Sequence, residues 1–223
     1  MISVEISNPF IIIFLVGSIL TYFINLLLEI GDYSFRKKNY GKIPSQMEEI
    51  KGIHEIFTEE KLKKINDYEN SKFFLFLPSS FCNLILSLSL VVFGFYPFIL
   101  NFLTSFINIT DHIGTTFLVF YLFLLLTSIP TEILSSIFSI YKEFVIEKKY
   151  GFSKMTIKLW ISDFIKESII SLIFMAILCF LATILLIKCK TFWWIFLAAL
   201  LISITFLMQI IYPKFISPLF NKF

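Results

Sequence analysis

The sequence predicts an all-α, polytopic membrane protein with about five transmembrane helices. Of its 223 residues, 57% are hydrophobic and the mean hydropathy is +0.85, whereas an ordinary soluble domain is about 45–50% apolar. A helix needs about 20 mostly apolar residues to cross a bilayer. Five windows meet that length with few or no charges: 9–30, 75–100, 113–140, 164–187 and 192–212. The whole chain, residues 1–223, is therefore expected to be a single membrane domain.

The first window and the charges between the windows predict how the chain crosses the membrane. Window 9–30 follows no Lys or Arg and is too long for the apolar part of a signal peptide, so we expect a retained helix. Of the 19 Lys and Arg residues, 17 fall in residues 31–72, in residues 141–166 or after residue 212. Because basic residues concentrate on the cytosolic side, the N-terminus is expected to be lumenal or outside and the C-terminus cytosolic.

Two cytosolic loops are expected, residues 31–72 and 141–163. The first holds nine basic and eight acidic residues, a balance typical of a solvated connection and not of a lipid-binding basic tail. Within it, Ser45 and Glu48 have the spacing of a capping box. Thr58, followed by two glutamates, predicts a second helix start.

The second window belongs to a stretch, residues 73–109, that is longer than one crossing needs. Pro78, Gly94 and Pro97 interrupt it, and such residues kink or end helices. The sequence leaves two alternatives open. The stretch forms one long or kinked helix, or it forms a span followed by a shorter interfacial piece.

Polar residues recur at steps of three and four along the third window, which places them on one helical face. They are Ser128, Thr131, Glu132, Ser135, Ser136 and Ser139, and a weaker stripe follows at Ser80, Asn83 and Ser87. Small hydroxyl residues of this kind let membrane helices pack closely. A carboxylate inside a bilayer is costly and should face protein or water, or be protonated. Close packing and a hydrated cavity both remain open, with Ser128, Thr131, Glu132, Ser135 and Ser139 as candidate lining residues.

The polar stretch between the third and fourth windows has the residues of a tight corner between helices. Lys148 and Lys149 suit the last turn of a helix, where cations complement the helix dipole. Gly151 suits the left-handed residue that closes a helix, and Ser153 suits the N-cap of the next helix.

Residues that would carry chemistry are scarce. The sequence has no GxSxG and no Gly-rich phosphate loop, and it contains two histidines. His54 begins "HEIFT", in which Thr58 stands where a zinc-binding HExxH helix needs its second His. The three cysteines form no CxxC pair. We therefore predict no catalytic residue and no metal ligand, and no basic surface that would bind nucleic acid.

Residues 138–166, "FSIYKEFVIEKKYGFSKMTIKLWISDFIK", resemble the signature of the zinc-dependent CAAX prenyl proteases of the a-factor-converting type. The chain departs from that signature at three positions. Lys148 stands where the family usually has a second Glu, Ser153 where it usually has Asn, and Ile137 where it usually has Pro. The residues that match are Ser139, Tyr141, Phe144, Val145, Ile146, Glu147, Lys149, Gly151 and Phe152.

Two further pieces are similar to the same family, in the same order along the chain. Residues 212–223, "YPKFISPLFNKF", resemble the family segment that leads from the fifth span into the peptidase domain. Residues 68–72, with the earlier Pro44, resemble its first cytosolic loop. The matching residues of the final segment are Pro213, Phe215, Pro218, Leu219, Phe220, Lys222 and Phe223.

The resemblance covers essentially the whole chain and implies the N-terminal part of a seven-helix membrane chamber. The family consists of zinc metalloendopeptidases that remove the last three residues from prenylated CAAX proteins. Its partners are membrane lipid and prenylated substrates, and a eukaryotic member would reside in the endoplasmic reticulum membrane. Its zinc-binding HExxH segment lies beyond residue 223. The chain is therefore expected to be inactive alone and to need a separate or missing peptidase domain.

Two alternatives to this hypothesis remain open. In the first, the chain is a non-enzymatic membrane scaffold, derived from that family, that binds lipidated proteins. In the second, it is a small transporter that uses Glu132 as an ion site, although no inverted repeat is evident.

Overall fold

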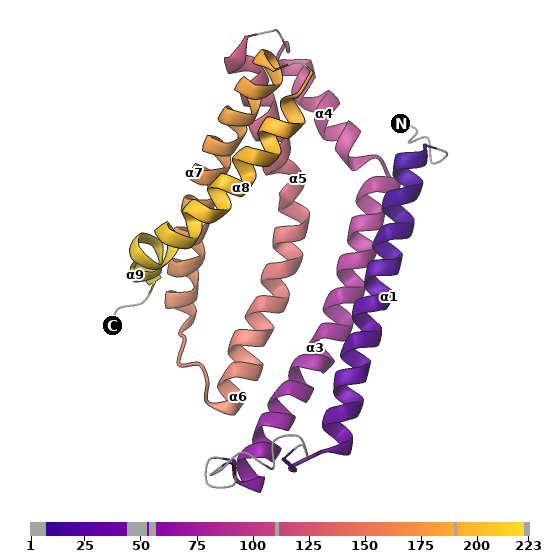
Figure 1. Ribbon diagram of the computed structural model, residues 1–223, viewed down its shortest axis with the longest axis vertical. Coiled ribbons are helices and arrows are strands. Elements are labelled where there is room, and N and C mark those ends of the chain that lie inside the picture. Colours follow the sequence, from indigo (N-terminus) through magenta and orange to yellow (C-terminus); the bar gives the residue numbers. More distant parts are fainter. Residues whose placement is uncertain (1–7, 44–52, 54–56, 110–111, 190, 221–223) are drawn as a thin grey trace. The chain divides into compact units, whose positions relative to one another are not determined.

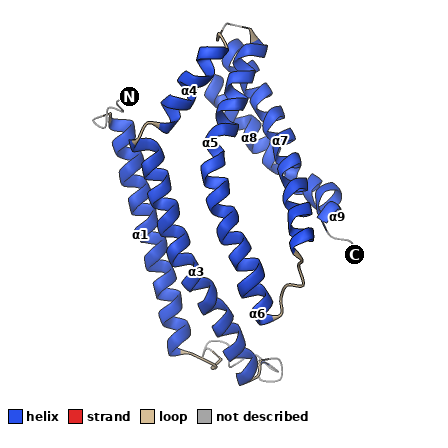
Figure 2. Cartoon of the chain, turned by 180° about the vertical axis from the view of Figure 1, so that it is seen from behind, coloured by secondary structure: helices blue, strands red, loops and turns tan. Residues whose placement is uncertain are grey.

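The computed structural model describes residues 8–43, 53, 57–109, 112–189 and 191–220. Helices make up nearly all of this described part, which contains no strand (Figures 1 and 2). Five of its helical segments are long and apolar enough to cross a membrane, which confirms the predicted fold class: Pro9–Lys38, Glu59–Val92, Ile113–Tyr150, Ile157–Lys188 and Trp193–Leu219.

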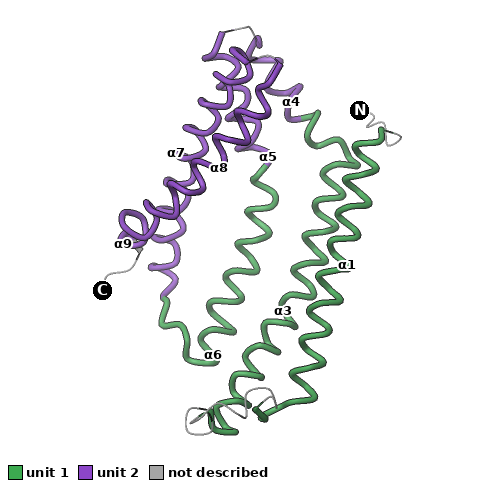
Figure 3. Tube along the Cα trace, viewed as in Figure 1, with its two compact units in different colours: residues 1–98, 128–155 green, residues 99–127, 156–223 purple. Residues whose placement is uncertain are grey.

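The chain divides into two compact units, which are described separately. Unit 1 consists of Met1–Phe98 and Ser128–Met155, and unit 2 of Ile99–Thr127 and Thr156–Phe223 (Figure 3). Each unit therefore combines segments that are far apart in the sequence.

In unit 1, helix α1 (Pro9–Lys38) lies side by side with α3 (Glu59–Val92). The Asn8 side chain caps α1 by accepting a bond from Phe10 N at 3.0 Å. Thr58 caps α3 as predicted, because its hydroxyl oxygen accepts from Lys61 N. Helix α1 extends to Lys38, into the stretch 31–72 that was expected to be a cytosolic loop, and α3 begins in that stretch where a helix start was predicted. The capping box predicted at Ser45 and Glu48 lies outside the described residues.

The structure resolves the alternatives for residues 73–109. Helix α3 ends at Val92, and a turn at Phe93 and Gly94 leads into the 12-residue helix α4 (Phe95–Phe106). Gly94 has φ +70°, a left-handed conformation that interrupts a helix and that glycine adopts at little cost. The expected window 75–100 is therefore a span plus a short separate helix.

Helix α5 (Ile113–Tyr141) continues without a break into the π-helix η2 (Lys142–Glu147) and the short α6 (Lys148–Tyr150). The corner that follows has Gly151 at φ +77°, as predicted. The N-cap prediction requires correction, because the next helix begins at Ile157 and Thr156 caps it. The Ser153 hydroxyl instead donates to the Glu143 carboxylate and accepts from Met155 N. That carboxylate holds Ser153 in the corner.

Unit 2 contains α7 (Ile157–Lys188), α8 (Trp193–Ile211), the π-helix η3 (Tyr212–Ile216) and α9 (Ser217–Phe220). Helix α7 buries the small side chains of Cys179, Ala182 and Thr183, and Thr183 is 0% exposed. Its hydroxyl donates to the Cys179 carbonyl oxygen at 2.7 Å. Small residues and satisfied hydroxyls are what close helix packing in a membrane requires.

Candidate functional site

Residues 147–152 of the signature pack against residues 67–71 of α3 within unit 1. The Tyr68 hydroxyl donates to Glu147 Oε1 at 2.8 Å. Two more aromatic rings surround this bond, with the Phe152 and Tyr150 ring centroids 4.7 Å and 5.4 Å from that of Tyr68. We call the set Asp67, Tyr68, Ser71, Glu147, Tyr150 and Phe152 the tyrosine junction.

A second set of hydrogen bonds ties the same elements together. The hydroxyls of Ser71 and Tyr150 lie 2.8 Å apart, and both approach the Asp67 carbonyl oxygen, at 2.9 and 2.8 Å. The Tyr40 hydroxyl donates to Asp67 Oδ1 at 2.9 Å, and this bond raises the pKa of Tyr40. Residues about 80 positions apart in the sequence are thereby joined.

The backbone of the signature explains how its side chains reach α3. A π-helix holds one residue more per turn than an α-helix, and such segments recur at functional sites. In η2 this arrangement buries Ile146 to 3% exposure and directs Glu147 toward Tyr68. Gly151 then ends the helix, with Phe152 N donating to the Glu147 carbonyl oxygen at 2.9 Å. The order of residues in the signature therefore specifies the turn at Gly151.

The other signature residues are arranged around this corner. Ile146 is buried, and Phe144 is half-buried with Lys148 Nζ 4.6 Å from its ring centroid. The exposed members are Ser139, Tyr141, Val145, Lys149 and Phe152.

The second predicted motif forms the end of unit 2. Pro213 and Phe215 lie in η3, where Phe215 is 69% exposed, while Pro218, Leu219 and Phe220 form α9. Lys166 Nζ donates to the Leu219 carbonyl oxygen at 3.3 Å and pairs with Asp163 at 3.0 Å. Lys222 and Phe223 lie outside the described residues.

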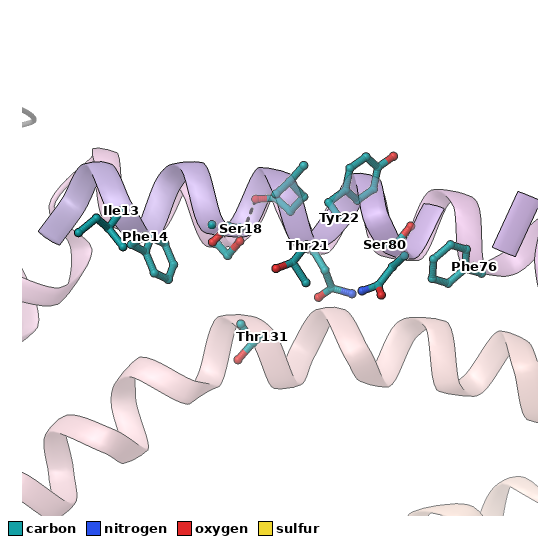
Figure 4. A pocket seen from close by; sticks show the side chains of 13 residues that line it. Ile13, Phe14, Ser18, Thr21, Tyr22, Phe76, Ser80 and Thr131 are labelled. Carbon is teal, nitrogen blue, oxygen red and sulfur yellow. Dashed lines mark hydrogen bonds between the residues drawn. The ribbon is translucent and has the colours of Figure 1, made fainter. Parts of the chain in front are cut away.

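An open cleft of about 630 Å³ lies within unit 1, and we call it the unit 1 cleft. Figure 4 shows Thr131 of α5 across from the side chains of α1 and α3. Thirteen residues line it: Ile13, Phe14, Gly17, Ser18, Thr21, Tyr22, Asn25, Phe76, Ser80, Asn83, Leu84, Ser87 and Thr131.

The cleft brings together part of what the sequence suggested. All three members of the weaker stripe, Ser80, Asn83 and Ser87, line it. Of the five candidates in the third span, Thr131 lines it, whereas Ser128, Glu132, Ser135 and Ser139 are not among its lining residues. Sequence reasoning missed the contribution of α1. The signal was present, because Ser18, Thr21 and Asn25 follow the same three-and-four spacing.

The polar side chains that α3 and α5 contribute to the cleft form hydrogen bonds within their own helices, as polar groups inside a membrane require. The hydroxyls of Ser80, Ser87 and Thr131 donate to backbone carbonyl oxygens three residues earlier, at 3.2, 2.9 and 2.7 Å. Asn83 Nδ2 donates to the Ser79 carbonyl oxygen at 2.9 Å. Their oxygen atoms can accept further bonds.

The described residues do not fit a zinc ion. No three His, Cys, Asp or Glu side chains in the described part of the chain are grouped so that they could hold a metal.

The fold and these sites define an integral, all-helical membrane protein whose apolar spans carry a polar cleft. Residues 32–222 match the family described as CAAX prenyl protease N-terminal, five membrane helices. The chain belongs to this family.

Relatives and a solved structure agree with this assignment. The chain is 29% identical over 191 residues to a CAAX prenyl protease 1 homolog of Dictyostelium discoideum, covering 83% of this chain and 42% of that protein. It is 28% identical over 193 residues to CAAX prenyl protease 1 of Saccharomyces cerevisiae, covering 85% and 41%. The crystal structure of S. mikatae Ste24p superposes with a TM-score of 0.78 at 25% identity, covering 97% of this chain and 49% of that one. The chain thus spans about two fifths of the length of these curated relatives.

Proposed function

We propose that this chain forms the N-terminal transmembrane part of a CAAX prenyl endopeptidase, which removes the C-terminal tripeptide from prenylated proteins. The observation that carries the proposal is the TM-score of 0.78 with Ste24p over 97% of the chain. A fold that is retained at 25% sequence identity supports a shared function, because a similar apolar composition alone would not preserve it.

The chain's part in this reaction is to build membrane structure. Family resemblance assigns hydrolysis to a zinc ion, and the described residues do not supply its ligands. We assign to this chain five spans and part of the chamber wall, with Ser128, Thr131, Glu132, Ser135 and Ser139 as proposed lining residues. The tyrosine junction stabilises the corner of the signature.

The proposal includes an orientation and a location. The basic residues of the loops support an orientation in which the tyrosine junction is cytosolic and the N-terminus is lumenal or outside. In a eukaryotic cell, the membrane would be that of the endoplasmic reticulum. Prenylated CAAX proteins would then reach the protein from the cytosolic face.

A chimera tests the proposal directly. In the Saccharomyces cerevisiae relative, the segment that aligns with residues 32–222 is replaced by the sequence of this chain, and cleavage of a farnesylated CAAX peptide is measured. We expect cleavage, because residues 32–222, which carry four of the five spans, match the membrane domain of the family. The unmodified yeast protein is the positive control, and a chimera with Gly151→Pro, which cannot adopt the φ of +77° at this corner, is the negative control.

The complete product of the gene that carries this sequence is assayed in parallel, with zinc supplied. If a monodisperse chimera and the complete gene product both fail to cleave, the enzyme proposal is wrong. Capture of prenylated protein without cleavage would then favour the alternative function, a non-enzymatic scaffold that binds lipidated partners.

A further inference from the structure

We propose that the unit 1 cleft binds an extended, uncharged peptide segment of about five residues through its main-chain amides. This inference deepens the proposed function and rests on it for the source of the peptide, a stretch of the substrate chain. The binding itself is argued from the cleft.

The dimensions of the cleft suit a short peptide. Its volume of about 630 Å³ falls in the range of roughly 300–1,000 Å³ that is typical of ligand sites. Along α1 it runs from Ile13 to Asn25, which at 1.5 Å per residue is about 18 Å. An extended chain rises about 3.3–3.6 Å per residue, so about five residues fill this length.

The lining residues select a neutral ligand. No Asp, Glu, Lys, Arg or His occurs among the thirteen residues that line the cleft, so nothing there recognises a phosphate, a carboxylate or an ammonium group. Eight of the thirteen nonetheless carry a hydroxyl or amide group: Ser18, Thr21, Tyr22, Asn25, Ser80, Asn83, Ser87 and Thr131.

Polar groups recur along the length of the cleft and can therefore bond to a peptide backbone at several points. They occur once per helical turn on α1 and again on α3, so a hydrogen-bonding partner stands about every 5 Å along the cleft. The hydroxyl oxygens of Ser80, Ser87 and Thr131 can accept from peptide N–H groups in addition to the bonds they donate. Asn25 and Asn83 carry both a donor and an acceptor, and can therefore pair with peptide carbonyl groups as well.

A hydrocarbon chain suits this lining less well than a peptide does. Lipid chains offer no hydrogen bond, and contact with polar groups that lack partners is unfavourable. Three of the apolar residues lie toward the ends of the cleft, Ile13 and Phe14 at one end and Phe76 at the other (Figure 4), while Leu84 lies between Asn83 and Ser87 on α3. Such contacts suit apolar side chains of a peptide whose backbone lies along the polar middle.

Photo-crosslinking tests the proposal without requiring catalysis. A benzophenone amino acid is placed at Thr21 or, in a second variant, at Ser87 of the full chain in detergent or nanodiscs. The probe is a fluorescent, uncharged ten-residue peptide of Ser, Asn, Ala and Val, offered with and without a farnesylated cysteine. The control position is Phe23, which is 53% exposed and absent from the cleft.

We expect both cleft positions to crosslink the unprenylated peptide at least about fivefold more than Phe23 does. Unlabelled peptide should compete, whereas farnesol should not. An Asn83→Leu change in the Thr21 variant should reduce crosslinking by about three- to tenfold, the range expected for one or two lost hydrogen bonds.

Two results would overturn the proposal. One is equal labelling at Thr21, Ser87 and Phe23 in protein that is monodisperse by size exclusion. The other is labelling that requires the farnesyl group and is competed by farnesol, which would make the cleft a lipid site. Because crosslinking needs no hydrolysis, its failure is distinguishable from failure of the proposed endopeptidase function.

Discussion

Units 1 and 2 achieve helix packing in different ways. In unit 1, polar and aromatic side chains join the helices, through the tyrosine junction and the stacked rings of Tyr33 and Phe73, whose centroids are 4.6 Å apart. In unit 2, small side chains on α7 are buried, and Phe117 and Phe180 meet edge to face at 5.8 Å. Unit 2 therefore depends on tight contact, whereas unit 1 keeps a polar cleft and depends on directional bonds.

The largest destabilisation is expected in unit 2, when a small buried side chain is replaced by a large one. Thr183→Phe places a large ring where the side chain is 0% exposed, and such overpacking costs about 3 kcal/mol. The measurement is the labelling rate of Cys179, which is 2% exposed, in a background where Cys82 and Cys189 are replaced by Ser. We expect a marked increase in that rate.

Thr205→Phe is the matched control for this substitution. Thr205 also donates to a carbonyl oxygen four residues earlier, at 2.8 Å, but it is exposed on α8. Its replacement should leave Cys179 labelling unchanged. Equal effects at the two positions would contradict the assignment of unit 2 to small-residue packing.

The next largest destabilisation is expected in unit 1, from the loss of a single hydrogen bond. Tyr68→Phe removes the hydroxyl that donates to Glu147, and a hydrogen bond to a charged group is worth about 1.5 kcal/mol or more. We expect a lower melting temperature with unchanged Cys179 labelling. Tyr141→Phe, at a side chain that is 50% exposed, should be close to neutral. A double change with Glu147→Leu should cost less than the sum of the single changes.

The corner of the signature should be sensitive to backbone conformation alone. At Gly151, φ is +77° and a Cβ would meet no atom within 4 Å, so Gly151→Ala costs only the left-handed strain of about 1 kcal/mol. Gly31→Ala, in open space within α1, should instead stabilise by about 0.5–1 kcal/mol. Thermal denaturation of the two variants checks the opposite signs.

The smallest effect is expected at Tyr40 and should depend on pH. The hydrogen bond to Asp67 raises the pKa of Tyr40 above its ordinary value of 10.0. The stabilisation is therefore present below pH 10 and is lost as the pH rises through the raised pKa. Melting curves of wild type and Tyr40→Phe should differ slightly at pH 8 and converge as the pH rises through the raised pKa of Tyr40. A difference that grows with pH would contradict this assignment.

Local features of the chain were predictable because neighbouring residues decide them. Five apolar windows predicted five spans, and the Thr58 cap and the Gly151 corner were confirmed. The Ser153 cap was wrong because Glu143, ten residues away, binds its hydroxyl. The break at Gly94 was left open, since a Gly within an apolar stretch is compatible with either a kink or a helix end.

By itself, the sequence determined the class of the protein, its number of spans and the charge asymmetry of its loops, because hydropathy and charge act along the chain. It also carried the family signature. Only the tertiary structure decided that Glu147 meets Tyr68 and that stripes on α1 and α3 line one cleft with Thr131. Those pairings join residues about 40 to more than 100 positions apart, and periodicity specifies which face of a helix is polar but not which helix it faces.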